Sequence, residues 1–81
     1  MDTLAIGLGQ AIRRRRLEAG LSQEQLAERA DVHRNHVGFV ERGERSPTVV
    51  VLDRIAQGLG IPAWELLKEG SSPPAVETSE T

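Results

Sequence analysis

The fold is decided by residues 21–26, which read LSQEQL. Ser22 suits a helix N-cap, because a serine hydroxyl accepts a hydrogen bond from a backbone N–H of the first turn. Gln25 stands three residues later, where its side chain closes a capping box, and Leu21 and Leu26 are placed to form a hydrophobic staple. This combination predicts that a helix begins immediately after Ser22.

The residues that follow predict a tight turn and another short helix. The helix that starts at residue 23 is expected to end near Ala30. Asp31 suits the turn, because aspartate tolerates a left-handed backbone better than most residues, and Val32 is expected to fill the core. The next helix is predicted from Arg34 to Arg42 and stops at Gly43.

Three more helices are predicted on either side of this pair. Residues 3–18 have a helical apolar period that ends before Gly20, and residues 49–59 have another, capped by Thr48 and ended by Gly60. The apolar positions are Leu4, Leu8, Ala11, Ile12 and Ala19 in the earlier helix, and Val49, Leu52, Ile55, Ala56 and Leu59 in the later one.

Pro62 opens a short fifth helix as a first-turn proline, and Trp64, Leu66 and Leu67 anchor it. No segment alternates as a strand does. The sequence therefore predicts an all-α domain over residues 1–70. Residues 71–81 have too little apolar content to fold, and we predict that they form a disordered acidic tail.

Composition narrows the class of protein. The chain has 81 residues and no cysteine. Its net charge of −2 argues against a protein that binds nucleic acid by charge alone. Residues 1–47 contain eight arginines and seven acids, and four of these arginines are consecutive, at 13–16. A solvated helix face is one explanation for that run. No apolar stretch approaches membrane-spanning length and no signal peptide is visible, so we expect a cytoplasmic protein.

The helix predicted over residues 34–42 presents an unusual outward side. Val37 and Val40 lie on one side, with Glu41 beside them. Arginine can bind a guanine edge, asparagine an adenine edge, and an apolar ring a thymine methyl group. Ordinary solvent exposure, with Phe39 as a core residue, is the alternative. The residues of the outward side and its flanks are Arg34, Asn35, His36, Gly38, Phe39 and Arg42.

With the preceding helix and turn included, the sequence resembles the Cro/CI-type family of helix-turn-helix DNA-binding domains, also called lambda-repressor-like or Xre-like. The matching residues are Gly20 to Ala27, Val32, Val37, Val40 to Gly43, Pro47, Thr48, Leu52, Ile55, Ala56, Leu59 and Gly60. The resemblance covers residues 4–69. It implies a five-helix lambda-repressor-like fold, with the helix-turn-helix at the second and third helices, and a sequence-specific transcriptional regulator that binds double-stranded DNA.

The resemblance also implies roles for individual residues. Arg34, Asn35 and Phe39 correspond to positions that face bases, with His36 and Gly38 beside them. The positions that meet phosphates in the family are Gln23, Arg42 and Arg45, and Arg13 is expected to add another phosphate contact. Arg16 and Glu41 occupy the positions of an enclosed structural ion pair.

The sequence departs from the family pattern at four positions. His33 stands where a better N-cap is usual, so we expect a weak start to the third helix. Gly38 costs about 1 kcal/mol relative to alanine, which closeness to DNA would explain, and Gly58 weakens the fourth helix in the same way. Phe39 stands at a position that is more often polar, so hydrogen-bond readout is not expected there.

One such domain reads only a few base pairs, so we expect a homodimer on a pseudo-palindromic operator. The setting is phage-repressor-like or restriction–modification controller-like, and no small-molecule effector is evident. Core burial is the alternative for Ile61 and Trp64. The residues predicted at the dimer interface are Val50, Val51, Ile61, Ala63 and Trp64. An antitoxin, or a protein-interaction module that keeps the fold, is the alternative function.

Nothing in the sequence predicts an enzyme or a cofactor. His33 and His36 have a spacing that can serve a metal, but a third ligand at suitable spacing is missing, so no metal site is expected. No glycine-rich phosphate loop or nucleophile elbow is present.

Overall fold

The computed structural model of the chain describes residues 3–71, and within them it has five helices and no strand. The helices are α1 (Thr3–Glu18), α2 (Gln23–Ala30), α3 (Arg34–Glu41), α4 (Val49–Leu59) and α5 (Ala63–Ser71). The all-α prediction is confirmed. Both boundaries of α5 differ from the prediction, because Pro62 precedes this helix and Ser71, predicted in the tail, is its last residue. The rest of the predicted tail, residues 72–81, lies outside the described residues.

The start of α2 has the predicted capping box. Ser22 Oγ accepts a hydrogen bond from the Gln25 backbone N–H at 3.0 Å, and Gln25 Oε1 accepts one from the Ser22 backbone N–H at 2.8 Å. Leu21 and Leu26 are both buried. Asp31 ends the helix with φ 58° and ψ 47°, the left-handed conformation that was predicted. Local sequence therefore sets both ends of α2.

The start of α3 has a side-chain cap at the residue that we expected to cap it weakly. His33 is the N-cap, and its Nδ1 accepts a hydrogen bond from the Asn35 backbone N–H at 3.0 Å. An imidazole nitrogen thus supplies the acceptor that serine or aspartate supplies elsewhere, so the cap is not lost. The helix ends one residue earlier than predicted, with Arg42 as C-cap and Gly43 next at φ 74°.

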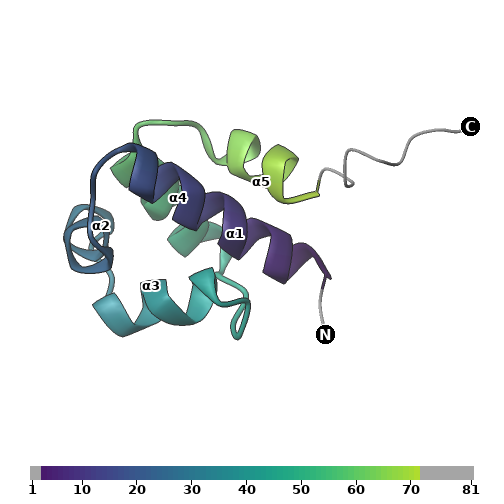
Figure 1. Ribbon diagram of the computed structural model, residues 1–81, viewed down its shortest axis with the longest axis horizontal. Helices are drawn as coiled ribbons and strands as arrows, with labels where there is room; N and C mark the ends of the chain where they lie inside the picture. Colours follow the sequence, from purple (N-terminus) through teal and green to yellow (C-terminus); the bar gives the residue numbers. More distant parts are fainter. Residues whose placement is uncertain (1–2, 72–81) are drawn as a thin grey trace, which may run out of the picture.

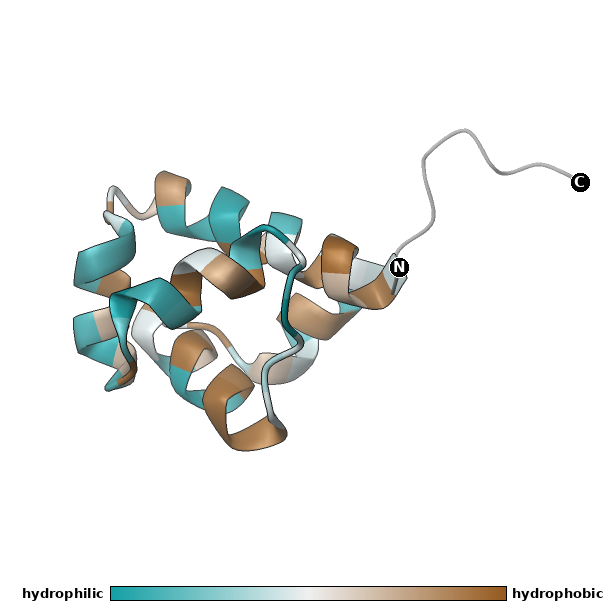
Figure 2. Cartoon of the chain, turned by 90° about the horizontal axis from the view of Figure 1, so that it is seen from below, coloured by the Kyte–Doolittle hydropathy of each residue, from teal (hydrophilic) through white to brown (hydrophobic). Residues whose placement is uncertain are grey.

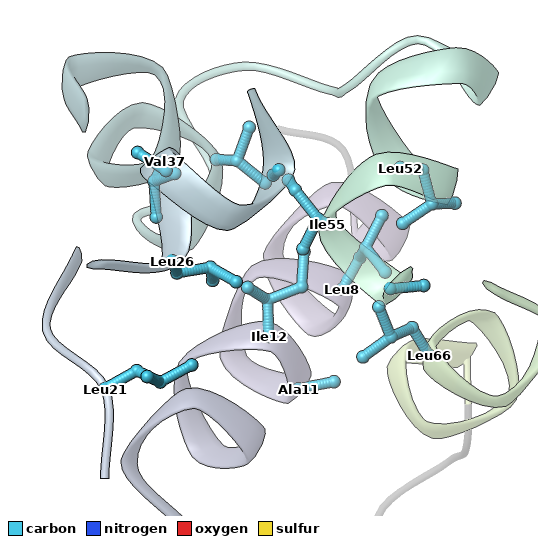
Figure 3. Packing of buried hydrophobic residues seen from close by; sticks show 13 residues of the cluster. Leu8, Ala11, Ile12, Leu21, Leu26, Val37, Leu52, Ile55 and Leu66 are labelled. Carbon is cyan, nitrogen blue, oxygen red and sulfur yellow. The ribbon is translucent and has the colours of Figure 1, made fainter. Parts of the chain in front are cut away.

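All five helices contribute to one core. Figure 3 shows Ile12 of α1 among Leu26, Ile55 and Leu66 from three other helices, and all four are fully buried. Five predicted apolar contact positions are wrong: Leu4, Ala19, Val49 and the expected α5 anchors Trp64 and Leu67 are exposed, Val49 to 84%. Leu4 and Val49 lie in the first turns of α1 and α4, Ala19 follows the end of α1, and only Leu66 of the three α5 positions is buried.

Glycines permit two of the helix crossings. A Cβ on Gly9 of α1 would lie 2.7 Å from the carbonyl oxygen of Glu41 and still closer to that of Val40, so α1 and α3 touch through backbone there. A Cβ on Gly58 of α4 would lie 3.1 Å from Leu26 Cδ1 of α2. Gly58 therefore weakens its own helix but lets two helices approach closely.

The principal helix contacts form a closed cycle. α1 packs on α3 and α5, α2 packs on α3 and α4, and α4 packs on α5. Figure 1 shows α1 crossing between α3, along the lower edge, and α5, along the upper edge. The outward side of α3 is left uncovered. Among residues 3–71, no helix is long and apolar enough to cross a membrane.

Candidate nucleic-acid interface

The start of α2 and the outward side of α3 enclose a groove of about 620 Å³. Figure 2 views the molecule from below Figure 1, from the side on which α3 lies. The groove is lined by Arg16, Ser22, Gln23, Glu24, Arg34, Asn35, Gly38, Phe39 and Arg42. It brings together most of the residues predicted to contact DNA, whereas Arg13, His36 and Arg45 lie outside its lining.

Arg34 and Asn35 are exposed at the first turn of α3. Arg34 Nη1 lies 3.3 Å from Glu24 Oε2 of α2, and both side chains are mostly solvent-exposed. An exposed pair of this kind contributes little to stability, and it leaves most guanidinium donors available. The first turn of α3 therefore presents one cation and one amide outward.

Gly38 is buried, and its neighbours give an intramolecular reason for the glycine. A Cβ there would lie 3.1 Å from Arg42 Nη1 and 3.5 Å from Gln23 Oε1. The missing side chain makes room for two polar side chains of the groove. His36 is partly buried, and its Nε2 has no hydrogen-bond partner among residues 3–71.

Phe39 is partly buried and does not belong to the core cluster, so the alternative of a core phenylalanine is wrong. Two guanidinium carbons lie over its ring, that of Arg45 at 4.8 Å and that of Arg42 at 5.3 Å from the ring centroid. Arg42 also donates to Glu44, from Nε at 3.0 Å and from Nη2 at 3.4 Å. The C-terminal end of α3 thus gathers two cations around one ring.

Arg16 and Glu41 form a buried, two-pronged ion pair between α1 and α3. Arg16 Nε donates to Glu41 Oε2 at 2.6 Å, and Arg16 Nη2 donates to Oε1 at 3.0 Å. A third donor, Nη1, reaches the carbonyl oxygen of Leu21 at 2.8 Å. The side chains are only 9% and 2% exposed.

Glu41 also reaches the groove. Gln23 Nε2 donates to Glu41 Oε1 at 3.0 Å, so the buried carboxylate orients the glutamine amide that lines the groove. The second Nε2 hydrogen and the Gln23 backbone N–H lie at the start of α2. Such positions suit an anion, because helix N-termini have free backbone donors.

The arginine run 13–16 does not form one solvated face. Arg15 hydrogen-bonds to Glu65 at 2.5 Å and to Glu69 from Nε at 2.7 Å, and Arg14 reaches Glu69 at 3.1 Å. The hydrogen bond from Arg15, and after it the one from Arg14, lowers the pKa of Glu69, and the bond to Glu69 raises the pKa of Arg15. Arg14 and Arg15 therefore tie α1 to α5, a contact that was not predicted from the sequence.

Arg13 is exposed and makes no ion pair with any residue in 3–71. It follows Gly9 by one helical turn and precedes Arg16 by another, which places it at the edge of the side of α1 that faces α3. With Gln10, Arg14 and Leu17 it lines a hollow on the exposed side of α1. This placement keeps it near the α3 side of the molecule.

The residues predicted for a dimer interface divide into two groups. Val50 and Trp64 are exposed, to 60% and 62%. Val51, Ile61 and Ala63 are partly buried and pack against the core. The prediction omitted Val49, and Figure 2 shows the first turn of α4, which contains it, as a hydrophobic turn at the lower edge. Within residues 3–71 no group of three His, Cys, Asp or Glu side chains could hold a metal.

Two short helices joined by a tight turn, with the polar side of the second left open, define a helix-turn-helix protein. The chain belongs to the Helix-turn-helix family, whose model matches residues 12–65.

Proteins of similar sequence include a control protein and a transcriptional regulator. Over 67 residues the chain is 37% identical to the control protein C.BamHI of Bacillus amyloliquefaciens, covering 82% of this chain and 83% of that one. Over 60 residues it is 38% identical to the uncharacterised HTH-type transcriptional regulator y4dJ of Sinorhizobium fredii, covering 74% and 78%.

Solved structures with the same fold include the restriction-modification controller protein C.AhdI of Aeromonas hydrophila. It aligns with a TM-score of 0.75 at 40% identity and covers 76% of this chain and 94% of that one. The clp gene regulator ClgR of Corynebacterium glutamicum aligns with a TM-score of 0.80 at 27% identity, covering 88% and 92%.

Proposed function

We propose that this chain is a sequence-specific transcriptional regulator that binds double-stranded DNA as a homodimer on a pseudo-palindromic operator. The observation that carries the proposal is the open groove along α3, which displays cationic and amide side chains on a helix anchored from behind by the Arg16–Glu41 pair. Membership of the Helix-turn-helix family and similarity to named control proteins support it. A regulator of this kind acts where the DNA lies, so we place it in the cytoplasm and assign it no catalytic step.

Arg34 and Asn35 read bases in this proposal, with His36 and Gly38 beside them. The geometry favours Arg34, because it stands at the open first turn of α3 with donors to spare. Phosphate contacts come from Gln23, Arg13, Arg42 and Arg45, which lie around the groove or on the α3 side of α1. Phosphate contacts set register and base contacts set sequence.

The first test is binding itself. Duplexes selected by the wild-type chain from randomised DNA are titrated between about 50 and 200 mM salt, where binding through phosphates weakens steeply. We expect salt-sensitive binding with a preferred sequence. A chain that only binds other proteins would select no sequence and show no such salt dependence.

The second test separates the assigned roles. Arg34→Ala should cost about 1–3 kcal/mol and relax the preference at one base pair of the half-site. Arg45→Ala should weaken binding to every duplex by a similar factor, because a phosphate contact carries no sequence information. A uniform loss in both variants would contradict the assignment.

The third test concerns the dimer. Val50 and Trp64 expose apolar side chains on α4 and α5, and we place the interface there, with Val51, Ile61 and Ala63 contributing their exposed edges. Val50→Glu should give a monomer in sedimentation equilibrium and weaken operator binding. Val50→Thr, which keeps the shape, is the matched control and should remain a dimer. If Val50→Glu remains a dimer, the interface does not include Val50 and the placement is wrong.

A further inference from the structure

The aromatic ring at the end of α3 has two cations and no core role. Phe39 lies outside the hydrophobic cluster, while Arg45 and Arg42 place their guanidinium carbons 4.8 and 5.3 Å from its centroid. A cation within about 6 Å of a phenyl centroid is attracted by the negative face of the ring. Two such contacts on one partly buried ring need an explanation beyond packing.

The two arginines differ in what else they contact. Glu44 takes two donors of Arg42 and offsets its charge. Arg45 has no carboxylate partner among residues 3–71, and it lies in the loop between α3 and α4. The ring is therefore the contact that orders the Arg45 side chain.

A ring and a carboxylate order an arginine in different ways. A carboxylate occupies guanidinium N–H donors and cancels the charge, whereas a phenyl ring does neither, since it offers no oxygen acceptor. Arg45 thus keeps its donors and its full charge for an anion. Ordering a long side chain beforehand also lowers the entropy lost when it binds.

We infer that Phe39 is a positioning residue: its ring holds the guanidinium of Arg45, and less strongly that of Arg42, ready for DNA backbone phosphates. This inference rests on the proposed DNA binding and deepens it. It replaces the expectation that the Phe39 ring reads a thymine methyl group, and it makes Phe39 act on affinity through Arg45 and leave sequence preference unchanged.

The decisive experiment is a double-mutant cycle on a duplex selected by the wild-type chain and on its single-base variants. Phe39→Leu keeps an apolar side chain without a ring and should weaken binding about two- to five-fold on every duplex, the size of an exposed cation–π contact. In the Arg45→Ala background the same change should have almost no further effect. Phe39→Tyr, which keeps the ring, should rescue the loss.

A measurement on the free protein separates this inference from the proposed function. In NMR spectra the Arg45 δ protons should be shifted upfield by the ring, and Phe39→Leu should abolish the shift. Thermal melts show whether each variant is folded, and Phe39→Met replaces Phe39→Leu if the latter is not.

Three results would overturn the inference. The first is an absent ring-current shift on Arg45. The second is a Phe39→Leu loss that persists undiminished without Arg45. The third is a loss confined to duplexes that carry one particular base pair, because a base contact would then explain it. A wild-type chain that shows the shift and binds no DNA would instead defeat the proposed function, and the phosphate role of Phe39 with it.

Discussion

Replacing Glu41 by glutamine should destabilise the domain severely. Glutamine keeps the size of the side chain and one carbonyl acceptor, but it leaves the Arg16 guanidinium, 9% exposed, without a counter-charge. Removing one partner of a buried pair costs about 3–5 kcal/mol. A domain of this size has a free energy of unfolding of only about 4–10 kcal/mol, so the change removes a large part of it.

The effect is measured by circular dichroism during heating and during urea titration. Since 1 kcal/mol shifts the midpoint of a small domain by about 4–8 °C, we expect Glu41→Gln to melt at least about 12 °C below the wild type. Glu44→Gln is the matched control: it makes the same chemical change in an exposed pair, where the expected effect is below about 1 kcal/mol.

Equal melting temperatures for Glu41→Gln and the control would refute the reasoning, because they would mean that Arg16 finds water or another partner at no cost. A second variant tests the physical cause. Arg16→Met combined with Glu41→Leu removes both charges, and it should recover much of the loss, since an apolar pair leaves no buried charge uncompensated.

Three further predictions concern other contacts. The pKa of Glu69 is lowered chiefly by Arg15, so the carboxylate contributes to stability above its usual pKa of 4.5. This contribution is lost as the pH falls through the lower pKa of the folded state. The stability of Glu69→Gln should therefore fall less than that of the wild type during acid titration. Gly9→Ala should lower the melting temperature by more than an ordinary helix substitution, because its Cβ would meet the backbone of α3; an unchanged midpoint would contradict the crossing. Glu44→Gln should tighten DNA binding and steepen its salt dependence in gel shifts at graded salt, because Arg42 regains its free charge. Weaker binding, or an unchanged salt dependence, would contradict this prediction.

Features set by neighbouring residues were predictable from the sequence. The Ser22 capping box depends on residues three apart, and the left-handed Asp31 depends on what its own side chain tolerates. His33 shows the limit of that reasoning. The usual preference of N-caps for serine, threonine, asparagine and aspartate predicted a weak cap at His33. In the structure its Nδ1 accepts the capping hydrogen bond.

Apart from the Arg16–Glu41 pair, which the family resemblance implied, the features that join distant segments were not predictable. Arg15 and Glu69 are 54 residues apart, and no local pattern pairs them. The sequence around Gly9 does not distinguish it from other helical glycines, because its role depends on the packing of α3 against α1. Val49 has the right period for the core, but periodicity cannot say where along a helix its neighbours stop covering it.

The surroundings of the candidate site were the hardest part to foresee. The outward side of α3 follows from helix geometry, which is why Arg34 and Asn35 were found. The association of Phe39 with Arg45 depends on how the loop after α3 folds back, and loops carry no period from which to predict it.

The closed cycle of helix contacts has a consequence for how the molecule comes apart. A chain of helices joined end to end would have two outermost members free to peel away singly, but a cycle has none. α1 and α5, the first and last described helices, hold each other through Arg15, Glu65 and Glu69. Loosening α5 therefore frees one flank of α1, whose other flank supports α3. A probe on Trp64 and a probe on α3 should then report one shared unfolding transition.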